Sequence, residues 1–239
     1  MNQHLELCVG LKTDPVEYRY SYEWLFKLMA EEGVRHVQMG SFFEIYQLPD
    51  SYFWDLKRAA DDYGITISSV FTSHRELGGF FLGGLWERVA RKSYERLIDA
   101  AALLGAKRIG SNPGAVLRDQ MERKEAGIAC YLRNMKELTA YAHYKGIEWL
   151  TMEPMSCLAE PPTLPEEIVH FADELMAYHK ATANTVPVGY CFDVSHGYAD
   201  GAGAVHHGHM ELFEAALPYL AELHLKNTDA RFHSTFGFS

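Results

Sequence analysis

The sequence predicts an α/β protein built on parallel β-strands. Short apolar runs of strand length alternate with longer amphipathic stretches of helical spacing along the chain of 239 residues. Four of the helical stretches end at a glycine, and a new apolar run begins directly afterwards. Strict alternation of this kind places each helix between two parallel strands. Seven such units favour a closed (β/α)8 barrel of the triosephosphate isomerase type over an open sheet.

Four strands are predicted in the first half of the chain. They cover Leu5–Leu11, Val37–Met39, Ile65–Phe71 and Arg108–Ser111. Apolar residues recur at helical spacing over Tyr22–Ala30, Tyr52–Tyr63 and Leu85–Leu104. Glycine supplies the left-handed residue that ends a helix, as expected at Gly33, Gly64 and Gly105. The stretch GGFFLGG at residues 78–84 predicts a flexible lid or a subunit contact of a homo-oligomer.

The second half of the chain continues the same alternation. Helices are predicted over Glu122–Tyr144, Glu166–Ala181 and Met210–Leu220, and strands over Glu148–Met152, Val188–Phe192 and Leu223–Lys226. No Gly-x-Gly-x-x-Gly or Gly-Lys-Ser/Thr loop follows a strand, which disfavours an open nucleotide-binding sheet. A barrel needs one more unit, so we expect residues 1–239 to form a single barrel domain that lacks strand 8 and the final helices at its C-terminus.

Composition excludes several classes of partner. Asp and Glu total 32 against 22 Lys and Arg, and this net charge of −10 repels phosphate backbones, so we expect no nucleic-acid partner. Four cysteines lie far apart without a Cys-x-x-Cys pair, which is typical of reduced thiols in the cytoplasm. The chain begins without a signal-peptide pattern, and no window approaches about 18 consecutive apolar residues. We expect a cytoplasmic protein without membrane contact.

Polar side chains lie at the ends of five of the predicted strands. They are His74, Asn112, Glu153, the pair Asp193 and His196, and the pair His224 and Lys226. Active sites of such barrels lie at the carboxyl ends of the strands, so these side chains are expected at one rim.

Each of these residues also has a structural interpretation. Asp193 could cap a helix, although no helix is expected directly after it, and His224 alone could be a satisfied core histidine. Glu153 precedes Pro154, and a buried glutamate without a partner is unfavourable. Glu153, Asp193 and His224 together favour a metal site. Their donor atoms suit Mn²⁺, Mg²⁺ or Co²⁺, with Zn²⁺ as a further alternative.

The same residues resemble the sugar isomerase/epimerase superfamily of xylose isomerase-like barrels. The resemblance rests on Glu153-Pro154, on Asp193-Val-Ser-His196 and on His224-Leu-Lys226. It implies one divalent metal ion, with Mn²⁺ preferred, held by Glu153, Asp193, His224 and a second Glu from strand 8. It also implies that His196 contacts substrate. The endonuclease branch expects a histidine in a His-Pro-Gly, where this chain has Asn112-Pro113-Gly114, so DNA repair is disfavoured.

The implied activity is isomerisation or epimerisation of a sugar or sugar phosphate. Glu153 is the expected base, which abstracts a proton next to a carbonyl, while the metal stabilises the enediolate. His74 and Asn112 are expected to contact substrate hydroxyls, and Lys226 and Arg231 a phosphate. Two alternatives remain open: dehydration of an inosose-like keto-sugar at the same metal site, and a non-catalytic sugar-binding relative.

Overall fold

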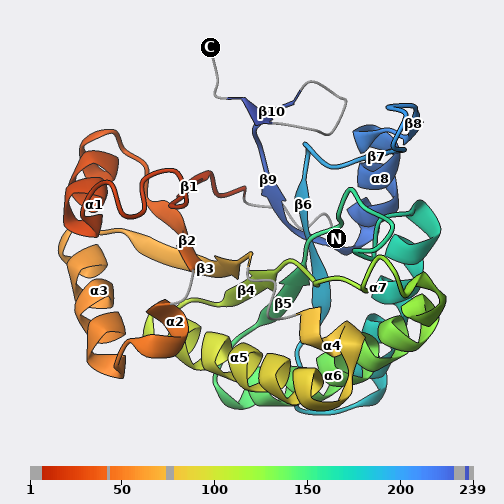
Figure 1. Cartoon of the computed structure of the whole chain (residues 1–239). Helices are drawn as coiled ribbons and strands as arrows, with labels where there is room; N and C mark the ends of the chain where they lie inside the picture. Colours follow the sequence, from red (N-terminus) through yellow and green to blue (C-terminus); the bar gives the residue numbers. More distant parts are fainter. Residues whose placement is uncertain (1–6, 42–43, 74–77, 229–234, 237–239) are drawn as a thin grey trace, which may run out of the picture.

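A curled sheet of seven parallel strands forms the centre of the protein (Figure 1). The computed structural model describes residues 7–41, 44–73, 78–228 and 235–236. The strand order is β1-β2-β3-β4-β5-β6-β9, and all neighbouring strands are parallel. The strands are β1 Gly10–Lys12, β2 His36–Ser41, β3 Thr66–Thr72, β4 Arg108–Ser111, β5 Trp149–Met152, β6 Val188–Asp193 and β9 Leu220–His224. The predicted α/β barrel fold is confirmed, as a partial barrel.

Helices cover the outer, convex side of this sheet (Figure 1). The longer ones are α1 Tyr22–Glu31, α3 Asp50–Asp62, α5 Gly84–Leu103, α6 Lys124–Tyr144, α7 Pro165–Ala181 and α8 His209–Ala216. The short ones are α2 Glu44–Gln47, α4 Gly79–Leu82, and the 3-10 helices η2 Met121–Arg123 and η3 Leu217–Tyr219. Two antiparallel pairs complete the structure, β7 Tyr198–Ala199 with β8 Val205–His207 and β10 Asn227–Thr228 with β11 Thr235–Phe236. Within the described residues, every helix is too short or too polar to cross a membrane.

Glycines end the helices before four of the strands, as predicted. Gly33, Gly64, Gly105 and Gly146 have φ angles of +74°, +67°, +75° and +78°. A side chain at such an angle would meet its own backbone, so glycine is the residue that turns the chain here without strain. The short turns bring each helix back against the sheet and start the next strand in parallel.

The core lies between the sheet and the helices. Strand β6 is buried along its whole length, and Phe26, Tyr94 and Phe171 from three different helices are fully buried against the sheet layer. Burial of one large apolar side chain contributes roughly 1.5–3 kcal/mol to the free energy of unfolding. The helices and the sheet therefore share one continuous apolar core.

The glycine-rich stretch at residues 78–84 packs its two aromatic side chains inside the chain. Residues 79–82 form helix α4, and its Phe80 and Phe81 side chains are 0% and 4% exposed. Their rings pack on Tyr131 of helix α6, with centroids 6.1 Å and 5.0 Å away. The expected exposure of these two aromatic residues was wrong, because their rings find partners in the core that the local sequence does not show.

Element boundaries differ from the prediction at both ends of the sheet. The first strand begins at Gly10 instead of Leu5, and Leu7, Cys8 and Val9 lie exposed before it. The last strand is Leu220–His224, earlier than predicted. Helix α8 already ends at Ala216, and a 3-10 turn containing Pro218 follows, because proline lacks the N–H that a continuing helix needs.

Strands β1 and β9 are the two edges of the sheet, and the described residues contain no backbone pairing between them. A side-chain contact instead connects β9 with β2, the neighbour of β1. Gln38 of β2 donates a hydrogen bond from Nε2 to Oε1 of Glu222 on β9, at 3.3 Å. Polar side chains of β2 and β9 therefore contact each other inside the curled sheet.

Candidate metal centre

Three strand ends bring the candidate ligands together. Glu153 follows the last residue of β5, Asp193 ends β6, and His224 ends β9. The register of the sheet pairs Asp193 with His224 directly. The Glu153 backbone N–H donates to Ser111 O of β4 at 3.2 Å, which keeps this residue in line with the sheet. Parallel strands present their carboxyl ends at one rim, so three separate segments supply one site.

Glu153, Asp193 and His224 each offer one donor atom within 4.8 Å of the other two. His224 Nδ1 lies 3.9 Å from Glu153 Oε1 and 3.9 Å from Asp193 Oδ2. Glu153 and Asp193 are only 4% and 2% exposed. Two buried carboxylates at this separation repel each other unless a cation lies between or beside them.

His224 provides the test of whether a metal ion fits this site. Its Nε2 lies 2.7 Å from Oε1 of Gln38, whereas its Nδ1 is buried and has no hydrogen-bond partner among the described residues. A buried imidazole nitrogen that faces two carboxylate oxygens without a hydrogen bond is suited to bind a cation. Two carboxylates and one imidazole are donors typical of Mn²⁺, Mg²⁺, Co²⁺ or Zn²⁺. The residues present fit a divalent metal ion.

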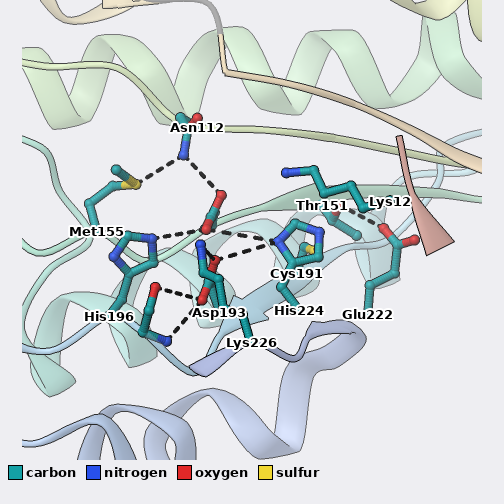
Figure 2. Close-up of polar contacts among 12 residues, drawn as sticks. Lys12, Asn112, Thr151, Met155, Cys191, Asp193, His196, Glu222, His224 and Lys226 are labelled. Atoms are coloured by element: carbon teal, nitrogen blue, oxygen red, sulfur yellow. Dashed lines mark hydrogen bonds and ion pairs between the residues drawn. The ribbon is translucent and has the colours of Figure 1, made fainter. Parts of the chain in front are cut away.

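Glu153 is held from three sides. His196 Nε2 lies 2.9 Å from its Oε1, and the Asn112 amide donates to its Oε2 at 2.9 Å. Asn112, His196 and His224 come from three different strand ends, and Figure 2 shows their side chains directed toward one another. Burial alone would raise the pKa of Glu153, but the hydrogen bond with His196 is the largest of the interactions that lower it well below the ordinary value. Glu153 is therefore ionised at neutral pH.

Asp193 is anchored through one oxygen and neutralised through the other. Its Oδ1 accepts hydrogen bonds from the backbone N–H and the hydroxyl of Ser195, both at 2.8 Å. Its Oδ2, which faces His224, forms an ion pair with Lys226 Nζ at 2.6 Å. The Lys226 ammonium supplies positive charge at a position where a metal ion would also bind Asp193.

His196 links the carboxylate to the loop that follows β5. Its Nδ1 lies 2.8 Å from the hydroxyl of Ser156, while its Nε2 contacts Glu153. Burial lowers the pKa of His196, but the hydrogen bond and charge of Glu153 outweigh it and raise the pKa above its ordinary value. The hydrogen bonds at both ring nitrogens hold the His196 ring in one orientation at the edge of the site.

A sequence model of the family described as xylose isomerase-like TIM barrel matches residues 26–237. The chain belongs to this family. The matched region contains Glu153, Asp193, His196, His224 and Lys226, which are the residues of the site. No curated protein sequence matches the chain.

Solved structures of the xylose isomerase-like fold resemble the chain over most of its length. A candidate xylose isomerase from Rhodospirillum rubrum ATCC 11170 is 20% identical, with a TM-score of 0.77 over 94% of this chain and 78% of that one. D-Psicose 3-epimerase from Clostridium cellulolyticum H10, solved with D-tagatose, is 16% identical, with a TM-score of 0.71 over 92% and 73%. A 3-keto-D-glucoside 4-epimerase from E. coli is 12% identical, with a TM-score of 0.64 over 93% and 80%. At these identities the likeness establishes the fold.

The predicted site residues of this xylose isomerase-like chain fall into three groups. Glu153, Asp193 and His224 form the cluster, and His196 contacts it, as described above. Asn112 and Lys226 also lie at the cluster, but their polar atoms bind Glu153 and Asp193. His74 and Arg231 lie outside the described residues.

The sequence analysis missed three polar residues that surround the cluster. Lys12 ends β1, forms an ion pair with Asp14 at 2.8 Å and lies 4.6 Å above the ring of Phe71. Gln38 contacts His224, and Glu222 contacts Gln38. A usable signal was present, because Gln38 lies inside the apolar run of β2 and Glu222 shares the strand face of His224 at a spacing of two residues.

Proposed function

We propose that this protein is a metal-dependent isomerase or epimerase of a sugar or sugar phosphate. The observation that carries the proposal is the convergence of Glu153, Asp193 and His224 on one point at the strand ends, with donor atoms within 4.8 Å. Family membership and the epimerases among the structural neighbours support the same reaction class. The proposed ligands are these three residues, and Mn²⁺ is the proposed ion.

Glu153 is the proposed base. Its carboxylate is ionised and buried, which allows it to accept a proton from the carbon next to a substrate carbonyl. A divalent ion at the site would polarise that carbonyl and stabilise the negative charge that develops after proton removal. His196 is proposed to exchange one of its two hydrogen bonds, to Ser156 or to Glu153, for one to a substrate oxygen. Isomerisation requires the proton to return at the neighbouring carbon, whereas epimerisation requires a second group on the opposite face.

We also propose that the protein acts in the cytoplasm. Four further residues are proposed to bind the substrate. Asn112 and Lys226 lie at the edge of the cluster, where a bound sugar would meet their amide and ammonium groups. His74 and Arg231 are proposed to contact substrate hydroxyls and a phosphate, respectively. A phosphate near Lys226 would bind in the last loops of the barrel, where this fold commonly holds phosphate groups.

The test is a screen of ketoses and ketose phosphates with Mn²⁺ in D₂O, followed by NMR. An isomerase or epimerase incorporates deuterium at a carbon next to the carbonyl and releases a product of unchanged composition. Loss of water from the substrate would instead assign the keto-sugar dehydratase alternative. A purified chain that binds no divalent ion and turns over no sugar would assign the non-catalytic, sugar-binding alternative and reject the proposal.

A further inference from the structure

Beneath the metal cluster lies a second polar layer, which the proposed reaction does not use directly. Thr151, Cys191 and Glu222 each precede a cluster residue by two positions on β5, β6 and β9, so they share the inward face of their strands. Gln38 enters this layer from β2. Figure 2 shows Thr151 and Glu222 on the side of the His224 ring away from Asp193 and His196. Gln38 and Cys191 contact the cluster only at His224 Nε2, and the hydrogen bonds of Thr151 and Glu222 go to other residues.

The hydrogen bonds of this layer have a defined direction. The Glu222 carboxylate accepts from Thr151 Oγ1 at 3.3 Å and from Gln38 Nε2 at 3.3 Å. An ionised carboxylate is only an acceptor, so it requires the amide nitrogen of Gln38, and not the amide oxygen, to face it. Gln38 Oε1 is thereby directed to His224 Nε2, at 2.7 Å. An amide oxygen is only an acceptor, so Nε2 must carry the proton of this bond.

Cys191 and Phe71 also pack against the His224 ring. Cys191 Sγ lies 3.2 Å from His224 Nε2. The Phe71 ring packs on the His224 ring in a T-shaped arrangement, with centroids 5.1 Å apart. Protonation at Nε2 leaves Nδ1 with its lone pair toward Glu153 and Asp193, the two proposed ligands.

We propose that Gln38, oriented by Glu222, is a positioning residue that selects the His224 tautomer and directs Nδ1 to the metal ion. The inference rests on the proposed metal site. Gln38 lies 186 residues before His224 in the sequence, and it comes from the opposite edge region of the sheet, so closure of the curled sheet is coupled to metal binding. A hydrogen-bond acceptor behind a ligating histidine fixes the ring and raises its basicity.

The experiment measures Mn²⁺ affinity by titration calorimetry on the full chain. Gln38→Met keeps the length of the side chain and removes the acceptor, and we expect it to weaken Mn²⁺ binding about 10- to 100-fold. The double variant Gln38→Glu with Glu222→Gln exchanges amide and carboxylate. Glu at position 38 still accepts from His224, and Gln at position 222 still bonds to it and to Thr151, so affinity should return to within about threefold of wild type.

Ser68→Ala is the matched control. Ser68 on β3 bonds to His36 Nδ1 of β2 at 3.0 Å, in the same sheet but without contact to His224. We expect its Mn²⁺ affinity to be unchanged. Two-dimensional ¹H–¹⁵N NMR of the Zn²⁺-loaded protein supplies a second readout, in which wild type and the double variant retain a slowly exchanging His224 Nε2–H signal and Gln38→Met loses it.

Several outcomes would overturn the inference. Wild-type affinity in Gln38→Met, equal weakening by Ser68→Ala, or failure of the double variant to recover affinity would each show that Gln38 acts only in packing. If wild type itself binds no divalent ion, the metal site of the proposed function fails, and this inference fails with it. If wild type binds and Gln38→Met binds equally well, the inference fails alone.

Discussion

Glu153 is the residue on which the contacts of the site converge. One oxygen faces His196 and His224, and the other accepts the Asn112 amide. Such a carboxylate is oriented before substrate arrives, and its lowered pKa keeps it ionised. Asn112 therefore holds Oε2 in place, whereas Oε1 faces the proposed metal ion and substrate.

Substitution of Glu153 tests the base. Glu153→Gln keeps the size of the side chain but removes its capacity to accept a proton, so turnover should fall by about 10²- to 10⁴-fold while the fold is retained. Steady-state kinetics and circular dichroism check the two parts. Glu174→Gln is the control, because Glu174 pairs with Lys136 on the outer helices. Full activity of Glu153→Gln would remove Glu153 as the base.

Lys226 offers a second test at the residue scale. Its ammonium neutralises Asp193 Oδ2, the oxygen that faces His224. A metal ion must compete with this ion pair, so Lys226→Met should tighten Mn²⁺ binding several-fold, as measured by calorimetry. The metal-free variant should also unfold at lower denaturant concentration, because two buried carboxylates lose a counter-charge. Weaker Mn²⁺ binding in Lys226→Met would contradict competition between the two cations.

At the scale of elements, close packing between β3, β4 and β5 supports the site from below. Gly110 lies in β4, and a Cβ there would come within 2.3 Å of the Phe71 ring and 2.5 Å of Thr151 Oγ1. Phe71 packs on His224, and Thr151 bonds to Glu222. The absence of a side chain at Gly110 therefore leaves space for Phe71, which packs on the proposed ligand His224, and for Thr151, which bonds to Glu222.

Gly110→Ala is predicted to destabilise the fold. The added methyl group displaces the Phe71 ring in a packed core, which should lower the free energy of unfolding by about 1–3 kcal/mol in urea titrations. Gly201→Ala is a suitable comparison, because a Cβ at Gly201 meets nothing within 4 Å, and its effect should stay within about 0.5 kcal/mol. Equal effects of the two substitutions would show that the close contacts at Gly110 relax without loss of stability.

At the scale of the whole molecule, the partial barrel concentrates its proposed ligands on adjacent strands. The strands β5, β6 and β9 are consecutive in the sheet, and β9 is an edge strand. An ion bound to Glu153, Asp193 and His224 would join this edge to the interior strands. Gln38 and Glu222 add a connection to β2, near the other edge.

Metal binding should consequently stabilise the whole domain. Mn²⁺ at about 100 times its dissociation constant adds about 2.7 kcal/mol to the free energy of unfolding, which corresponds to a rise in Tm of roughly 5–10 °C for a chain of this size. Calorimetric melting with and without EDTA measures the shift. Asp193→Asn removes one proposed ligand charge and should abolish most of it. An equal shift in Asp193→Asn would place the ion elsewhere.

The sequence by itself determined the alternation of strands and helices and the rim on which the polar residues lie. Both follow from local physics, since apolar periodicity distinguishes helix from strand and the glycines after the helices define their ends. Because parallel strands carry their carboxyl ends to one rim, Glu153, Asp193 and His224 could be grouped before any coordinates were known.

Only the tertiary structure decided what those residues contact. The burial of Phe80 and Phe81, the ion pair of Lys226 with Asp193, and the approach of Gln38 to His224 all join segments distant in the chain. Such contacts depend on strand register and on the curl of the sheet, which set distances that periodicity in a single sequence does not encode. The tertiary structure also decides which nitrogen of His224 is left without a hydrogen bond in the described part of the chain, because Gln38 of strand β2 bonds to the other nitrogen.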